Sequence, residues 1–176
     1  MIVTVGHGTA SQQELEELLV GAQLASVVDV RRHPGSRRHP HVAYDRLEAW
    51  LPAVGIDYRW DERLGGRRSR MQGSPHTGLR DPSLQGYADH LETPEFRDAI
   101  EGVLSEARLR RVAVLCSESV WWRCHRRLIA DHVILLTDVP LRHLLHDGRL
   151  DEHHPADVVR VEAGRLVYDG GEPTLL

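Results

Sequence analysis

The sequence contains no lysine, and all 22 of its basic side chains other than histidine are arginines. No physical requirement of folding excludes lysine from every position, so a GC-rich coding bias is the simplest explanation. Acidic residues outnumber the arginines, and the formal net charge is -4 at pH 7. This balance argues against a protein coated uniformly with positive charge for nucleic-acid binding.

Aromatic residues, cysteines and long apolar runs are also scarce. Aromatics make up 5% of the chain with a single Phe, so aliphatic side chains must build the core. Two cysteines do not suggest a disulfide framework, and the first residues lead into an expected strand rather than a signal peptide, so we expect a reducing cytoplasm. No apolar run approaches the roughly 18 residues of a membrane-spanning helix, and we expect no membrane span. The 176 residues fit one domain.

Short aliphatic runs alternate with helical patterns along most of the chain. We expect strands over residues 2–5, 27–30, 56–60, 112–115 and 139–145, and helices over residues 11–21, 44–54, 93–107 and 120–135. Residues 158–161 and 165–168 suggest a terminal hairpin. Strands that alternate with helices predict a three-layer, Rossmann-like α/β domain with a mostly parallel sheet, right-handed crossovers and a small C-terminal hairpin.

Reactive side chains gather where the fourth strand of this series ends. Cys116 closes the run 112–115, Glu118 follows it, and Ser119 reads as the N-cap of a helix that carries Cys124 and His125. Ligands of open α/β sheets usually bind outside the carboxyl ends of the strands. The stretch therefore marks a candidate site.

Other polar residues follow the ends of the first and second strands. His7 comes after residues 2–5 within a Gly-His-Gly segment, and Asp29 and Arg31 lie at the exit of the second strand. An aspartate in such an apolar run needs a cationic partner or a role in a site. Since the carboxyl ends of parallel strands open to one side of a sheet, we expect these residues to converge with Cys116.

Two arginine-rich loops follow the strands. Residues 31–41 include Arg37 and Arg38 in a loop broken by proline and glycine, and residues 67–78 begin with Arg67 and show no hydrophobic periodicity. Arginine loops bind phosphates through paired N–H groups, although they can also be merely solvated. We expect phosphate or nucleic-acid contacts in the first loop.

An ordered set of short motifs resembles the domain of unknown function 488 family (DUF488). The motifs are Thr4-Val-Gly-His7, Val28-Asp-Val-Arg31 with Pro34 and Ser36-Arg37, Leu64-Gly-Gly66, Gly86-Tyr-Ala with Thr93-Pro-Glu-Phe96, and Leu115-Cys-Ser-Glu118 followed by Cys124-His-Arg126. The resemblance covers about residues 2–145, leaves about 146–176 as a C-terminal extension, and departs from the pattern at His41-Val42. It implies a fold and a set of site positions but no reaction. Those positions are His7, Asp29, Arg31, Cys116, Glu118, Cys124, His125 and Arg126.

The first functional hypothesis is an enzyme. Cys116 would be a thiolate nucleophile whose pKa is lowered by a helix N-terminus and by Arg123 or Arg126, and Glu118 or His125 would move protons. The arginine loops would hold a phosphorylated small molecule, a nucleotide or nucleic acid. Six residues separate Cys116 from Arg123, one more than in a phosphatase-type loop. A reaction at a glycosidic bond with Glu118 and Asp29 as the carboxylate pair is an open variant.

Two other hypotheses remain. Cys116, Cys124 and His125, with His7 as a further candidate, could bind zinc or iron, but the seven residues between the cysteines do not match a CxxC motif. Alternatively, the arginine loops could bind nucleic acid without catalysis, with Trp121 or Trp122 stacked on a base. The sequence requires no cofactor, and its C-terminal histidines are most simply solvated.

Overall fold

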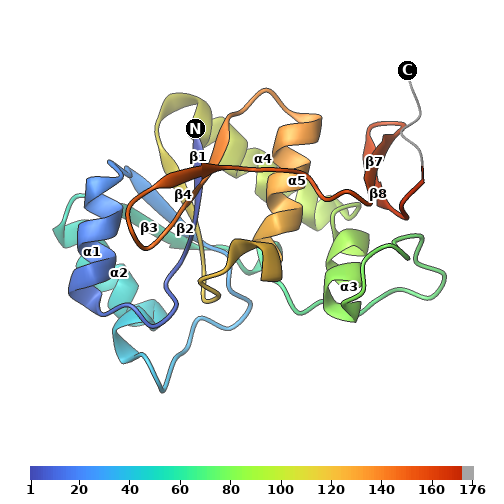
Figure 1. The fold of residues 1–176 in the computed structure, drawn as a ribbon. Helices are drawn as coiled ribbons and strands as arrows, with labels where there is room; N and C mark the ends of the chain where they lie inside the picture. Colours follow the sequence, from blue (N-terminus) through green and yellow to red (C-terminus); the bar gives the residue numbers. More distant parts are fainter. Residues whose placement is uncertain (172–176) are drawn as a thin grey trace.

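A computed structural model describes residues 1–171 of the chain, and a six-stranded sheet in the order β3-β2-β4-β1-β5-β6 lies at its centre (Figure 1). The strands are β1 (Ile2–Gly6), β2 (Ser26–Asp29), β3 (Asp57–Trp60), β4 (Val112–Cys116), β5 (Leu141–Leu144) and β6 (Leu150–Glu152). The first five are parallel, and β6, which the sequence patterns did not predict, is antiparallel to β5. The predicted α/β architecture with a mostly parallel sheet is confirmed.

Five helices cover the two faces of the sheet. They are α1 (Gln12–Gly21), α2 (Tyr44–Ala53), α3 (Pro82–His90), α4 (Pro94–Leu109) and α5 (Arg126–Leu136). Figure 1 shows α1 and α2 together on one side and α3, α4 and α5 on the other. The predicted capping box of α1 is present, with the Ser11 side chain accepting from the Glu14 N–H and the Glu14 carboxylate accepting from the Ser11 N–H.

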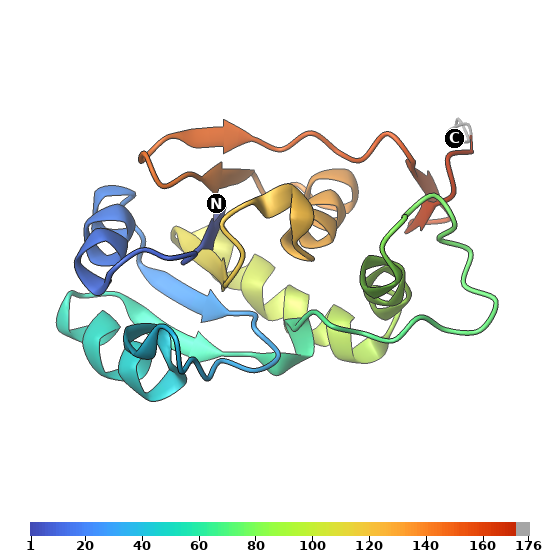
Figure 2. The same ribbon diagram turned by 60° about the horizontal axis from the view of Figure 1, so that its bottom comes forward.

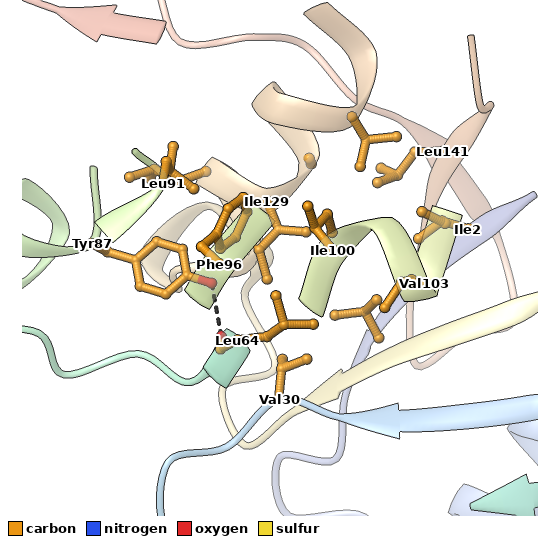
Figure 3. Close-up of a cluster of buried hydrophobic side chains, with 14 of the residues drawn as sticks. Ile2, Val30, Leu64, Tyr87, Leu91, Phe96, Ile100, Val103, Ile129 and Leu141 are labelled. Atoms are coloured by element: carbon orange, nitrogen blue, oxygen red, sulfur yellow. Dashed lines mark hydrogen bonds between the residues drawn. The ribbon is translucent and has the colours of Figure 1, made fainter. Parts of the chain in front are cut away.

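Alternate side chains of each strand enter two separate cores, as the pleat of a strand requires. In β4, Val112, Val114 and Cys116 pack toward α3, α4 and α5, whereas Ala113 and Leu115 pack toward α1 and α2. Figure 3 shows the first core, where the Tyr87 hydroxyl donates to the Leu64 carbonyl oxygen at 2.7 Å. The alternation therefore directs the Cys116 thiol toward the layer that contains α5.

The C-terminal hairpin is present as predicted and lies apart from the main sheet. Its strands β7 (Val159–Glu162) and β8 (Arg165–Tyr168) pair antiparallel and lie beside α3 (Figure 2). The two turn residues Ala163 and Gly164 both have positive φ, as in the type I′ turns that suit tight hairpins. The Tyr168 hydroxyl donates to Asp131 on α5 at 3.0 Å and so fastens the hairpin to the central layer.

The segment after β4 differs from the prediction. Ser119 does not cap a helix, because its hydroxyl packs against Gly8 and Trp121 stacks flat on His143 of β5, with ring centroids 3.9 Å apart. A short 3₁₀ turn (Trp121–Arg123) and an extended Cys124 follow, and α5 begins only at Arg126. The prediction of a helix over residues 120–135 was therefore wrong in its first six residues, which form a loop over the end of the sheet.

Candidate functional site

A cavity of about 510 Å³ opens at the carboxyl ends of β1, β2 and β4. Of the predicted site residues, six side chains line it: His7, Arg31, Arg67, Cys116, Glu118 and His125. Cys124 lines it as well. The strand ends and the loop before α5 thus bring together residues that lie far apart in the sequence. The volume falls within the roughly 300–1,000 Å³ typical of small-molecule sites.

Two thiols and one imidazole form a compact group in the wall of this cavity. His125 Nδ1 lies 3.5 Å from Cys124 Sγ and 4.0 Å from Cys116 Sγ. The other ring nitrogen, Nε2, donates to the Val30 carbonyl oxygen at 3.2 Å. A carbonyl oxygen can only accept, so Nε2 carries a hydrogen, and Nδ1 is the nitrogen that faces the two thiols.

Arg126 lies behind this group and is 1% exposed. Its Nε donates to Cys124 Sγ at 3.5 Å, and its Nη2 donates to the Glu118 carbonyl oxygen. No carboxylate within residues 1–171 forms an ion pair with the guanidinium. A buried charge without a counter-charge is costly. The Cys124 sulfur is the group in contact with it that can become an anion.

The two cysteines consequently differ in acidity. The hydrogen bond from Cys116 and the positive charge of Arg126 lower the pKa of Cys124 below the usual thiol value, although burial opposes them. The same hydrogen bond, together with burial, raises the pKa of Cys116. Of the two thiols, Cys124 is therefore the more acidic, and its sulfur is the one that the Arg126 guanidinium contacts. The sequence analysis expected the lowered pKa at Cys116, whereas the contact with Arg126 favours Cys124.

His7 borders the cavity beside a buried ion pair. Arg31 Nε donates to Asp29 Oδ1 at 2.8 Å, the Tyr58 hydroxyl donates to Asp29 Oδ2 at 2.9 Å, and Arg31 Nη1 lies 3.4 Å from His7 Nε2. Burial first of all, and then the charge of Arg31, lower the pKa of His7 to about 4. At neutral pH His7 is therefore an uncharged imidazole.

Asp29 does not line the cavity and is fully buried with both oxygens hydrogen-bonded. It holds Arg31 in position and is not placed to pair with Glu118 across a substrate. The proposed carboxylate pair is for this reason not formed. The physical cause is the neighbouring Arg31, whose guanidinium folds back onto Asp29 and also donates to the Val42 carbonyl oxygen at 2.8 Å.

Two glycines let the backbone approach this site. A Cβ on Gly6 would overlap the Glu118 carbonyl oxygen and lie 2.8 Å from Arg126 Nη2, and a Cβ on Gly66 would lie 2.7 Å from His125 Nδ1. The end of β1 thus presses on the loop that Arg126 holds. The backbone of Gly66 lies equally close to the ring of His125.

The Cys116, Cys124 and His125 ligand atoms all lie within 4.8 Å of one another. Two thiolates and an imidazole suit zinc, and in catalytic zinc sites three protein ligands leave one position open. The hydrogen bond from His125 Nε2 to a backbone carbonyl is of the kind that orients metal-binding histidines. The residues thus fit a metal as well as a reactive thiol.

The family model for the domain of unknown function DUF488 matches residues 11–133. The chain belongs to this family. No curated protein and no solved structure matches the chain. The DUF488 match includes the loop between β4 and α5 with both cysteines, whereas His7 and the strands from β5 onward lie outside it. None of the helices in the described part of the chain is both long enough and apolar enough to cross a bilayer.

Not every predicted residue lines this cavity, and some residues that line it were missed. Arg37 and Arg38 are exposed and do not line the cavity, and Arg126 stands behind Cys124 rather than in the wall. Arg123, which was expected beside Cys116, lines the cavity; Arg32, His33, Ser36 and His39 also line it and were not predicted as site residues. Arg32 follows Arg31 directly, so the strand exit itself was a signal for it. Nothing local distinguished the others.

Proposed function

We propose that the protein is a thiol-dependent enzyme that acts on a phosphorylated, nucleotide or nucleic-acid-like substrate, with Cys124 as the nucleophile. The observation that carries the proposal is the buried guanidinium of Arg126, whose anionic contact among the described residues is Cys124 Sγ. A buried cation that stabilises a thiolate is a recurrent way to activate a cysteine. We expect the enzyme to work in the cytoplasm, where its thiols stay reduced.

The steps follow from the positions of the side chains. The Cys124 sulfur forms a bond to the electrophilic atom of the substrate, and the leaving group departs with its electron pair. His125 Nδ1, which faces both sulfurs, takes the Cys116 proton and passes it to the leaving group. A water molecule then attacks the covalent intermediate: its oxygen bonds to the substrate atom, the Cys124 sulfur leaves as a thiolate with the electron pair of the broken bond, and a proton of the water returns through His125 to Cys116. Glu118, exposed at the rim of the cavity, is a second acceptor for protons.

The basic side chains of the cavity support an anionic substrate. Arg32, Arg67 and Arg123 line it and form no ion pair with a carboxylate of residues 1–171, so their N–H groups are free to bind phosphate oxygens. Arg31 is committed to Asp29, but its Nη1 still faces the cavity beside His7. A non-catalytic nucleic-acid-binding module would use the same arginines without needing the thiolate.

Alkylation of the purified protein by iodoacetamide, followed by peptide mapping of each cysteine over pH 5–10, tests the proposal. We expect Cys124 to react with an apparent pKa well below about 8.5, the ordinary thiol value, and Cys116 to react only at higher pH. Cys116→Ser, which keeps a hydroxyl donor beside the sulfur, is the matched control and should leave the alkylation profile of Cys124 largely unchanged. Ordinary or slower reactivity of Cys124 in the metal-free protein would reject it as the nucleophile.

A zinc-type metal centre is the second candidate, favoured by the three ligand atoms within 4.8 Å of one another. Elemental analysis of the same preparation decides between the two. One metal ion per chain that is lost in both Cys116→Ser and Cys124→Ser would assign the cysteines to the metal. In that case the cavity would hold the substrate against the open metal position.

A further inference from the structure

A second cavity of about 850 Å³ adjoins the first and shares part of its wall, including Glu118 and Arg123. Its remaining wall comes from the start of α3, the 3₁₀ turn, α5 and the segment before β7. The charged residues around it are three arginines and three carboxylates: Arg80, Arg123, Arg127, Asp81, Glu118 and Asp157. This balance differs from the arginine-rich first cavity, so the second is not simply a continuation of an anion site.

An exposed tryptophan forms one wall of the second cavity. Trp122 is 52% exposed, more than any other Trp, Tyr or Phe side chain in the described part of the chain. It is nevertheless held in place, because Trp121 meets it edge to face with ring centroids 5.5 Å apart. Trp121 is itself stacked on the buried His143.

A buried chain of hydrogen bonds holds the ring of His143, on which Trp121 stacks, in one position. His143 Nε2 is 2.9 Å from His153 Nδ1, and His153 Nε2 is 2.8 Å from the buried carboxylate of Asp131. Asp131 accepts a hydrogen, so the donors are ordered along the chain and each ring has one orientation. The indole of Trp122 is thus a rigid exposed platform with little entropy to lose on binding.

Besides the shared Arg123, two further arginines line the second cavity, and they too have no carboxylate partner among residues 1–171. Arg80 and Arg127 make no ion pair and no side-chain hydrogen bond with any residue in the range 1–171, although twelve other arginines pair with carboxylates. A flat aromatic surface with both donors and acceptors around it suits a nucleobase, whose edge presents donors and acceptors and whose face stacks on indole.

We propose that the substrate contains a nucleotide unit whose base stacks on Trp122 in the second cavity while its phosphate binds the arginines of the first. This rests on the proposed function and narrows its substrate class. The shared Arg123 lies between the two positions, where it can reach the phosphate or the sugar. The Cys124 sulfur then faces the phosphate end of the nucleotide.

Isothermal titration calorimetry of the full chain with nucleoside 5′-monophosphates and with ribose 5-phosphate tests whether a base stacks on Trp122. Ribose 5-phosphate is the reference probe because it lacks the base. We expect the monophosphates to bind more tightly than ribose 5-phosphate. Trp122→Ala should weaken binding of the monophosphates by about 5- to 150-fold and leave ribose 5-phosphate unchanged, since stacking on an aromatic side chain contributes that much per base. Trp122→Phe should recover most of the loss.

Leu109→Ala, at a residue that is 88% exposed on α4, is the matched control for loss of a surface apolar side chain. An eight-nucleotide single strand distinguishes the source of the nucleotide. A nucleic-acid substrate is supported if the strand binds in a way that depends on Trp122 and weakens steeply with salt, while the monophosphates bind weakly. A free nucleotide is supported if the monophosphates bind more tightly than the strand. The inference fails if Trp122→Ala binds every base-containing probe as the wild type does, or loses ribose 5-phosphate to the same degree.

The binding and alkylation experiments fail independently of each other. Titration repeated on Cys124→Ser needs no thiol chemistry, and alkylation needs no nucleotide. A thiol of ordinary reactivity combined with Trp122-dependent binding would remove the proposed nucleophile and keep the nucleotide site. A reactive Cys124 without base-dependent binding would do the opposite.

Discussion

Replacement of Arg126 by glutamine isolates the effect of the buried charge on Cys124. The guanidinium Nε lies 3.5 Å from the sulfur. At an effective dielectric constant of about 20, unit charges about 3.5–5 Å apart interact by roughly 3–5 kcal/mol. Since about 1.36 kcal/mol corresponds to a change of one in pKa, Arg126→Gln should raise the pKa of Cys124 by roughly 2–3. With the pKa of Cys124 at about 6 in the wild type, the thiolate fraction at pH 7, and with it the alkylation rate, should fall by about 10- to 100-fold.

The measurement is the rate of Cys124 alkylation against pH for the wild type and two variants. Arg126→Lys retains the charge and should keep most of the reactivity, whereas Arg127→Gln removes the next arginine along α5, which does not contact the sulfur, and should behave as the wild type. Circular dichroism and thermal melts establish that each variant is folded. A folded Arg126→Gln whose profile coincides with that of the wild type would refute the argument that Arg126 stabilises a thiolate.

Two further predictions concern stability. Gly6→Ala forces a methyl group against the Glu118 carbonyl and should lower the free energy of unfolding, measured in urea, by about 1–3 kcal/mol. Gly102→Ala, in open space on α4, is the control and should raise it by about 0.5–1 kcal/mol. Equal effects of the two substitutions would contradict the close approach of Gly6 to Glu118. Burial is the main cause that lowers the pKa of His7 to about 4 and the pKa of His143 to about 3. The unfolded chain therefore takes up protons below about pH 6.5 that the folded chain does not, and stability should fall from pH 6.5 toward 3. A free energy of unfolding that is equal at pH 7.5 and pH 5 would exclude this.

The sheet and the location of the site were predictable because both depend on local patterns. Aliphatic runs marked β1, β2 and β4, and parallel strands present their carboxyl ends on one side whatever their order. That rule alone brought His7, Arg31 and Cys116 together. The capping box at Ser11 was likewise predictable, since all of its atoms lie within four residues.

The predictions that were wrong or missing concern segments whose structure depends on residues far away in the sequence. Ser119 precedes a plausible helix, yet its hydroxyl packs on Gly8 and the next residues are drawn to His143, 24 positions after Ser119 in the chain. β6 is a short and mostly polar segment that exists only because β5 pairs with it. That the buried guanidinium of Arg126 contacts Cys124 and not Cys116 depends on the direction of the Arg126 side chain, which no spacing rule reveals.

Arg126 also separates the two candidate chemistries at this site. With one thiolate, the buried pair of Arg126 and Cys124 is neutral. With zinc, two thiolates balance the metal ion and the guanidinium leaves a net positive charge in the interior, which is unfavourable. If the site binds zinc, Arg126→Gln should therefore tighten zinc binding, measured by competition with a chromophoric chelator, whereas Arg127→Gln should not. If the site is a reactive thiol, the same variant loses alkylation at neutral pH. One substitution thus moves the two readouts in opposite directions, because the same buried cation favours a lone thiolate and opposes a fully charged metal site.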